Sequence, residues 1–321
     1  MIYIISPADT TTGGVECLHQ LGNSFIKAGH ECKIHYIGNS KKAEIFFKYY
    51  GVNAALEIED LNKNILIVPE IMTNIMGNFR HIKKCIFWLS LDNYLYRKRE
   101  NIFVDYYKRF RSLLGGRVPV FFMKKYFHIT QSHYASEYLK RFGINSTLIG
   151  DYLNDDFINT AIHTKNTIVK SDQVIFNPAK GKKSLKLLKK LFPNYQYIPL
   201  VNMSKEEVIK SLNSAKVYVD LGQHPGKDRI PREASLMGCV VFTSRFGSAG
   251  NSFDVPLDSY FKVETSANSI ADLGKKIQLV FDEYIKYSKM QDAYRDSILK
   301  EKLAFDRAVI ELYSSISSHN F

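Results

Sequence analysis

The sequence predicts an α/β protein made of two doubly wound domains. Short apolar segments of strand length alternate with amphipathic helical segments through both halves of the chain, which is typical of parallel sheets covered by helices. Around residues 151–172 the pattern turns polar and loses its period, which indicates a connection between domains. At 321 residues the chain is long for one core and comfortable for two domains of about 150 residues each.

The first half begins with a buried strand at 2–5, followed by a loop rich in Thr and Gly. A helix over 15–28 follows, because Leu18, Leu21 and Phe25 recur at helical spacing and Gly29 can end the helix. A right-handed crossover places the turn Gly13-Gly14 over the carboxyl edge of the sheet. The later elements are strands at 33–37, 65–68, 84–89, 128–131 and 147–149, and a helix at 134–142. Residues 1–160 are therefore predicted to form an N-terminal domain.

The second half repeats this logic without recognisable sequence repetition, and residues 173–281 are predicted to form a second domain. The remaining residues, 282–321, read as two long amphipathic helices with no strand between them, which we expect to pack back on the N-terminal domain. The expected elements of the second domain are strands at 174–176, 196–199, 217–221 and 239–243 and helices at 184–192, 205–215, 232–237 and 269–281.

The composition is that of an ordinary soluble globular protein, with 45% hydrophobic and 24% charged residues. The longest apolar runs, such as 118–123, are far shorter than the roughly 20 residues that span a bilayer, and the N-terminus lacks the apolar run of a signal peptide. We therefore expect a cytoplasmic location. The four cysteines show no metal-ligand spacing and are expected to be reduced packing residues, and no metal is expected.

The net charge of +12 predicts an anionic partner. The segment Tyr94–Phe127 holds nine Lys/Arg residues against Glu100 and Asp105, together with ten aromatic residues. Such a mixture can dock on an anionic membrane surface, where rings lie at the headgroup level and cations meet lipid phosphates. It can also bind single-stranded nucleic acid, or it can form an ordinary helix with a solvated basic face. Because no nucleic-acid-binding signature is visible, we expect the inner face of the membrane as the partner.

The stretch from Val217 to Asn251 is the most informative part of the chain. It predicts a buried strand, a polar loop over 222–229, a helix opened by Pro231, and a second buried strand. An open α/β sheet binds its ligand outside the carboxyl ends of the strands, where a helix N-terminus suits phosphate. Five charged residues crowd this loop and the first turn of the helix, namely Lys227, Asp228, Arg229, Arg232 and Glu233.

Two further glycine-containing turns, Gly13-Gly14 and Lys180-Gly181, are predicted at carboxyl edges. Glycine lets backbone N–H groups approach an anion, and lysine neutralises a diphosphate. Taken singly, each turn is equally consistent with a structural turn that binds nothing.

Three motifs make the chain resemble the GT-B glycosyltransferases, and among them the retaining nucleotide-sugar enzymes of glycosyltransferase family 4. They are Thr12-Gly-Gly-Val-Glu16, Asn177-Pro-Ala-Lys-Gly181 and Pro231-Arg-Glu-Ala-Ser-Leu-Met-Gly-Cys-Val-Val241. The third is similar to the family's run Leu-Glu-Ala-Met-Ala-x-Gly-x-Pro-Val-Val, in which the Glu holds the nucleotide ribose. The resemblance implies a GT-B fold, in which two Rossmann-like domains face a central cleft, an N-terminal acceptor domain and a C-terminal nucleotide-sugar domain.

The resemblance also assigns candidate residues and marks two departures. Glu233 matches the ribose-binding Glu, whereas the first acidic residue of the family's E-x7-E pattern falls at Pro225, so its usual sugar contact is absent or moved to Asp228. The family's phosphate-binding Arg is replaced by Asn177, and Lys227 or Arg229 can supply the missing charge. The expected donor-binding residues are Gly13, Gly14, Asn177, Lys180, Lys227, Arg232 and Glu233.

Asp92 follows a strand of the first domain and is expected to orient an acceptor hydroxyl or contact the transferred sugar; Ser132 and His133 are placed similarly. A capping role is equally consistent with each of these positions. The expected catalytic residues are Asp92, Asp228 and Arg229.

The resemblance implies a retaining transferase that moves a sugar from a nucleoside diphosphate donor to a growing, lipid-linked bacterial surface glycan such as lipopolysaccharide or capsule. No cofactor other than the donor is expected. Two alternatives stay open at this point: a nucleotide-sugar 2-epimerase of the same fold, and a basic nucleic-acid-binding protein.

Overall fold

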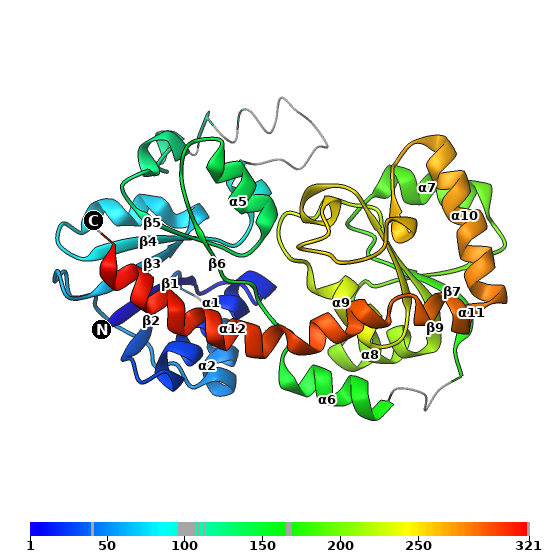
Figure 1. Ribbon diagram of the computed structural model, residues 1–321, viewed down its shortest axis with the longest axis horizontal. Helices are drawn as coiled ribbons and strands as arrows, with labels where there is room; N and C mark the ends of the chain where they lie inside the picture. Colours follow the sequence, from blue (N-terminus) through cyan, green and yellow to red (C-terminus); the bar gives the residue numbers. More distant parts are fainter. Residues whose placement is uncertain (40–41, 96–106, 108–109, 112, 165–168, 320–321) are drawn as a thin grey trace. The chain divides into compact units, whose positions relative to one another are not determined.

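The computed structural model describes residues 1–39, 42–95, 107, 110–111, 113–164 and 169–319 (Figure 1). The chain divides into two compact units. Unit 1 comprises Met1–Asp151 and Lys302–Phe321, and unit 2 comprises Tyr152–Glu301.

Unit 1 is built on a six-stranded sheet with the order β2-β1-β3-β4-β5-β6, and every strand pair is parallel. The strands are β1 (Ile2–Pro7), β2 (Cys32–Ile37), β3 (Ile65–Pro69), β4 (Lys83–Trp88), β5 (Phe127–Thr130) and β6 (Thr147–Leu148). The helices are α1 (Gly13–Lys27), α2 (Glu44–Tyr50), η1 (Glu70–Asn78), α3 (Leu91–Leu95), η2 (Val120–Met123) and α5 (His133–Lys140). The near-continuous apolar runs of β1, β3 and β4 are buried on both faces, as parallel strands between helical layers require.

The end of the chain also belongs to unit 1, through the last part of the long helix α12 (Asp292–Ser318). Ser24 of α1 donates a hydrogen bond of 2.7 Å to Asp306, and His30 stacks on Tyr313 with ring centroids 3.6 Å apart. These contacts hold this part of α12 against the segment of α1 and the turn after it.

Unit 2 is built on a five-stranded parallel sheet with the order β11-β10-β9-β7-β8. Its strands are β7 (Ser171–Phe176), β8 (Gln196–Pro199), β9 (Ala215–Asp220), β10 (Val240–Ser244) and β11 (Lys262–Val263). Its helices are α6 (Asp155–Thr164), α7 (Lys182–Leu191), α8 (Lys205–Ser214), α9 (Arg229–Leu236), η3 (Gly247–Gly250), η4 (Ser259–Phe261), α10 (Ala267–Asp282) and α11 (Tyr284–Lys289), followed by the beginning of α12.

Two groups of helices cover the faces of this sheet. Helix α7 packs against α10, whereas α9 packs against α6 and α8 (Figure 1). The first pair packs closely, because a Cβ atom added to Gly274 of α10 would lie 1.8 Å from the ring of Phe192, directly after α7. A glycine is therefore required where these two helices meet.

The structure differs from the expected elements in two segments. The polar stretch 151–172 contains helix α6, which buries only Phe157 and Ala161, one turn apart, and so shows little apolar periodicity. The tail is not two long helices: α10 extends to Asp282, the short α11 follows, and α12 alone has 27 residues. The units also meet in sequence at Asp151–Tyr152 and Glu301–Lys302, whereas the sequence pattern placed the boundaries near 160, 173 and 282.

Both sheets reverse their winding direction once. In unit 2 the reversal lies between β7 and β9, because β8 adds on one side of β7 and β9 to β11 add on the other. Ligands of open α/β sheets bind at such a switch point, outside the carboxyl ends of the strands. Among the described residues, no helix is long and apolar enough to span a membrane.

Candidate functional site

The carboxyl ends of β7 and β9 bring two loops together at the switch point of unit 2. Phe176 pairs with Val219, so the segment Asn177–Gly181 and the segment that begins at Asp220 leave the sheet side by side. Gly181 has a φ of 60°, in the left-handed region, and a Cβ atom there would lie 2.7 Å from the backbone of Leu221. A Cβ atom on Gly222 would lie 2.4 Å from the Cβ of Lys180. Only glycines allow these two loops to approach so closely.

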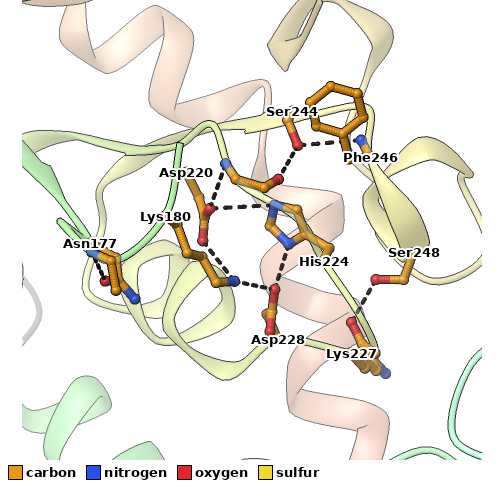
Figure 2. A network of polar contacts seen from close by, with 12 residues as sticks. Asn177, Lys180, Asp220, His224, Lys227, Asp228, Ser244, Phe246 and Ser248 are labelled. Carbon is orange, nitrogen blue, oxygen red and sulfur yellow. Dashed lines mark hydrogen bonds and ion pairs between the residues drawn. The ribbon is translucent and has the colours of Figure 1, made fainter. Parts of the chain in front are cut away.

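Four ionisable residues meet where the loops touch, and we call them the polar cluster: Lys180, Asp220, His224 and Asp228 (Figure 2). The Lys180 Nζ atom lies 2.6 Å from Asp228 Oδ2 and 3.4 Å from Asp220 Oδ2. The His224 ring lies between the same two carboxylates, with Nδ1 2.7 Å from Asp228 Oδ2 and Nε2 3.5 Å from Asp220 Oδ1. Two cations and two anions thus alternate around one buried centre.

Burial and the neighbouring charges shift the pKa values of the cluster residues in opposite directions. Burial opposes the charge on Lys180 and on His224, but Asp220 and Asp228 outweigh burial and raise the pKa of both residues above its ordinary value. Burial likewise opposes the charge on Asp228, but Lys180 and His224 outweigh it and lower the pKa of Asp228 to about 2. The neighbouring groups of the cluster thus favour the charged forms of Lys180, His224 and Asp228.

Asp220 and Asp228 are held differently. The Asp220 side chain is 1% exposed, accepts a hydrogen bond of 3.2 Å from the N–H of Gly222, and lies 3.4 Å from the hydroxyl of Tyr218. The Asp228 side chain is 23% exposed and stands at the N-cap position of α9, where it makes no capping hydrogen bond. Asp220 is thus anchored to its strand, whereas Asp228 is held by the two cations.

The end of β10 and the segment after it hold the loop through hydrogen bonds. Ser244 donates a hydrogen bond of 2.5 Å to the carbonyl of Gly222, and Ser248 donates one of 2.6 Å to the carbonyl of Gly226 (Figure 2). The N–H of Ser248 also donates to the carbonyl of His224 at 2.9 Å. These bonds fix the backbone on either side of His224.

Arg232 and Lys227 are held by a residue far along the chain. The Arg232 side chain is 1% exposed; its Nη1 lies 2.6 Å from Glu301 Oε2, and its Nε and Nη2 donate to the carbonyls of Asp228 and Lys227, each at 3.2 Å. Lys227 Nζ lies 2.7 Å from Glu301 Oε1. The Glu301 carboxylate on α12 therefore bridges Lys227, which precedes α9, and Arg232, which lies in α9. The buried Arg232 side chain in turn holds the carbonyls of Lys227 and Asp228.

Arg229 and Glu233 lie one turn apart at the start of α9 and are half-buried. The Arg229 Nε atom lies 3.7 Å from Glu233 Oε1. The helix begins at Arg229 rather than 232, because Pro231 in its first turn needs no N–H partner. Asn177 accepts a hydrogen bond of 3.0 Å from the N–H of Ala179, which closes the turn before Lys180.

The expected residues of the first half lie in unit 1. Gly13 is the first residue of α1, and a Cβ atom on Gly14 would make only an ordinary contact of 3.6 Å with Leu89. Asp92 is buried at the start of α3, after β4, and accepts a hydrogen bond of 2.9 Å from the Tyr134 hydroxyl. Ser132 caps α5 through the N–H of Ala135, which is the structural role that the sequence left open for it.

Glu70 is an ionisable residue of unit 1 that the sequence analysis did not single out. It follows β3 directly, is buried, and accepts a hydrogen bond of 3.0 Å from the N–H of Leu89. Burial raises its pKa to about 7, although these backbone hydrogen bonds and Arg117 act in the opposite direction. Glu70 thus ties the end of β3 to the loop before α3, the helix that carries Asp92.

The structure brings most of the expected donor residues together. Lys180 contacts Asp228 directly, Arg232 contacts the backbone of Lys227 and Asp228, and Arg229 lies near Glu233. The sequence analysis missed Asp220, His224 and Glu301. The regular spacing Asp220-x3-His224-x3-Asp228 was a visible signal for the first two, whereas nothing local marked Glu301.

The polar cluster also has the composition of a cation site. One ligand atom from each of Asp220, His224 and Asp228 lies within 4.8 Å of the others. The cation that lies against both carboxylates here is the Lys180 ammonium group.

Solved structures similar to this chain are glycosyltransferases. A glycosyltransferase from Rickettsia africae ESF-5 has a TM-score of 0.66 and 14% sequence identity, with 99% of each chain covered. HepE of Anabaena in complex with UDP has a TM-score of 0.65 and 8% identity, over 98% of this chain and 99% of its own. WaaG, a glycosyltransferase involved in lipopolysaccharide biosynthesis, has a TM-score of 0.60 and 10% identity, over 96% of this chain and 99% of its own. No protein-family model and no curated protein matches the sequence.

These similarities establish the fold. The chain has the GT-B fold, with two Rossmann-like units that each carry a parallel sheet, and the predicted fold class is confirmed. Membership of glycosyltransferase family 4 stays a prediction.

Proposed function

We propose that this protein is a glycosyltransferase that moves a sugar from a nucleoside diphosphate donor to a glycan acceptor. The observation that carries the proposal is the gathering of Lys180, Arg229 and Glu233 at the switch point of unit 2, in a chain with the GT-B fold. A carboxylate and several cations at the carboxyl edge of a parallel sheet suit the ribose and the diphosphate of such a donor. HepE, solved with UDP and with UDP-glucose, supports a nucleotide-sugar partner.

In this proposal Glu233 accepts hydrogen bonds from the ribose hydroxyls, and Lys180 and Arg229 neutralise the diphosphate. The backbone N–H groups near Asn177 are further donors for the phosphate oxygens. Lys227 and Arg232 act mainly through the loop, because Glu301 already holds both.

We propose that the transfer retains configuration at the anomeric carbon, as in the enzymes that the sequence resembles. The bond between the anomeric carbon and the diphosphate oxygen breaks, and the acceptor oxygen forms the new bond to that carbon on the same face. The leaving diphosphate oxygen takes the proton of the acceptor hydroxyl. Cations that stabilise the leaving diphosphate then supply most of the catalysis, and no nucleophilic carboxylate is required. Asp92 of unit 1 is proposed to orient the acceptor, and no metal is part of this scheme.

A panel of nucleotides and sugar donors tests the proposal. Wild-type protein is heated with UDP, GDP, CMP and dTDP and with their sugars, and the true ligand at about 100 times its Kd should add about 2.7 kcal/mol of stability. The stabilising donor is then incubated with and without glycan acceptors. Conversion of the donor to an epimer without an acceptor would favour the epimerase alternative, and the absence of any stabilising nucleotide would contradict both.

Replacing Glu233 with glutamine should weaken binding of the nucleoside diphosphate by roughly ten- to a hundredfold, because a charge-assisted hydrogen bond is worth about 1.5–3 kcal/mol. Calorimetric titration measures the loss. The control is Glu264→Gln, which makes the same change at an exposed carboxylate of unit 2. Unchanged affinity in a folded Glu233→Gln variant would remove Glu233 from the site.

We further propose that the acceptor is a lipid-linked bacterial surface glycan and that the protein works at the inner face of the cytoplasmic membrane. Support comes from the basic, aromatic segment Tyr94–Phe127, of which residues 96–106, 108–109 and 112 lie outside the described residues. Phe121 and Phe122 are each 66% exposed, and Lys124 lies over the ring of Phe121 at 5.9 Å. Exposed rings beside exposed lysines suit an anionic lipid surface.

Charge reversal at Lys124 and Lys125 should weaken binding to anionic liposomes by at least about thirtyfold, since each basic residue near such a surface contributes about 1 kcal/mol and an acidic residue in its place adds repulsion. Sedimentation with vesicles of phosphatidylglycerol and phosphatidylcholine at low salt measures the effect. Reversal of Lys205 and Lys210, two exposed lysines of α8, makes the same change in net charge in unit 2 and should leave sedimentation unchanged. Equal losses of liposome binding in both variants would mean that binding depends on the net charge of the protein and not on the position of the lysines.

A further inference from the structure

A single carboxylate oxygen holds both cations of the polar cluster. Asp228 Oδ2 lies 2.6 Å from Lys180 Nζ and 2.7 Å from His224 Nδ1, whereas Asp220 contacts these two cations through different oxygens at 3.4 and 3.5 Å. An anionic oxygen between an ammonium and an imidazolium group has the contacts that a phosphate oxygen would make there. The position that suits a phosphate is thus filled by a side chain of the protein itself (Figure 2).

The Asp228 side chain has an alternative interaction, as the cap of helix α9. Asp228 is the N-cap residue of α9, and aspartate is among the best residues for capping a helix. Because Pro231 at the third helical position has no N–H, the cap bond would be accepted from the N–H of Ile230. Its side chain makes no such bond and points to Lys180 and His224 instead. Its partial exposure contrasts with that of Asp220, which is buried and anchored.

We propose that Lys180 and His224 form an anion site, that Asp228 occupies this site while it is empty, and that a phosphate of the donor displaces Asp228, which then caps α9. The identity of the phosphate as part of a sugar donor rests on the proposed function. The anion site and its internal occupant rest on the cluster alone.

The physical reason is the cost of burying unpaired charge. His224 is 1% exposed and the Lys180 side chain 23% exposed, so two neighbouring positive groups balanced by Asp220 alone would be destabilising. Asp228 balances the charge until a phosphate arrives. The ligand must then compete with the carboxylate, so its apparent affinity is reduced by the fraction of molecules in which Asp228 still occupies the site.

This competition reverses the usual result of mutating a binding-site residue. Asparagine at position 228 can still cap α9 but cannot compete as an anion. Asp228→Asn should therefore tighten the binding of pyrophosphate and of UDP about tenfold, or about 1.4 kcal/mol, and leave uridine unaffected. Pyrophosphate is included because its binding does not depend on which base the protein recognises.

Three further variants separate the proposal from simpler effects. Asp272→Asn removes an exposed carboxylate of α10 and should change pyrophosphate affinity little, which controls for net charge. Asp228→Ala cannot cap α9, so its gain should be smaller than that of asparagine. In a Lys180→Met background, Asp228→Asn should have a smaller effect, because one of the two cations for which Asp228 and the phosphate compete is gone.

The pH dependence of wild-type binding gives a second measurement that needs no variant of Asp228. The charged groups that face His224 are Asp220 on β9, Asp228 on its own loop and Lys180 after β7, with the Tyr218 hydroxyl behind Asp220. Since these groups raise the pKa of His224, UDP affinity should fall as pH rises from 7 to 9, above the phosphate's own pKa of about 6. His224→Gln should bind more weakly and show a flatter profile.

The outcomes are distinct. Weaker or unchanged pyrophosphate binding in folded Asp228→Asn overturns the proposal, and a flat wild-type pH profile overturns the role of His224. If the wild type binds UDP and Asp228→Asn weakens it, the proposed function stands and this inference fails. If no nucleotide binds but pyrophosphate binding tightens in Asp228→Asn, the anion site stands and the proposed function fails.

Discussion

Replacing Lys180 with methionine should slow sugar transfer by about a hundred- to a thousandfold, the range seen when one group that stabilises developing negative charge is removed. Methionine keeps most of the length of the side chain and removes the cation. The loss is expected in kcat, because the negative charge on the diphosphate grows as the bond to the sugar breaks. Binding of UDP should also weaken far more than binding of uridine, which carries no phosphate.

The matched control is Lys183→Met, which makes the same change at an exposed lysine of the neighbouring helix α7. Because Lys180 also balances Asp220 and Asp228, the fold of the variant is checked by circular dichroism and thermal denaturation. Equal losses of UDP and uridine affinity would mean that Lys180 only supports the loop. Transfer at the wild-type rate would exclude it from the reaction.

Replacing Glu301 with alanine should lower the free energy of unfolding of unit 2 by about 3–5 kcal/mol, because it leaves the buried Arg232 guanidinium without its carboxylate. Lys227 loses its partner at the same time. Urea denaturation measures the change, and nucleotide affinity should fall with it, since Arg232 holds the carbonyls of Lys227 and Asp228.

Glu311→Ala on the same helix is the control, since Glu311 is exposed. A second test replaces both partners, Glu301→Met with Arg232→Leu. Because apolar residues can replace a buried ion pair at little cost, the double variant should be more stable than Glu301→Ala. Stability lost equally in Glu301→Ala and Glu311→Ala would place the effect in the helix rather than in the ion pair.

The double variant also shows whether nucleotide affinity is lost because unit 2 is less stable or because the loop is displaced. It should regain stability without regaining nucleotide affinity, because leucine cannot donate to the two loop carbonyls. Recovery of both stability and nucleotide affinity would mean that the segment 222–233 needs only apolar packing at this position. Comparison of Glu301→Ala with the double variant therefore decides whether Arg232 positions the loop or only packs against it.

Much of the fold was predictable because local patterns report burial. The apolar runs at 2–5, 65–68 and 217–221 are strands that helices cover on both faces, and such strands have no polar side to interrupt the run. The density of charge between the strands at 217–221 and 239–243 placed the candidate site in the segment 222–233. Helix α6 was not visible in the sequence because only one narrow stripe of it is buried.

The sequence by itself determined the two α/β units, the parallel strands, and the loop on which charged residues gather, since hydrophobic period and turn residues are local properties. Tertiary structure alone decided which charges meet. Lys180 contacts Asp228 because β7 and β9 are neighbours in the sheet, and Arg232 contacts Glu301 because α12 passes beneath the loop. Strand order and helix packing bring together residues 48 and 69 positions apart, and no local pattern contains that information.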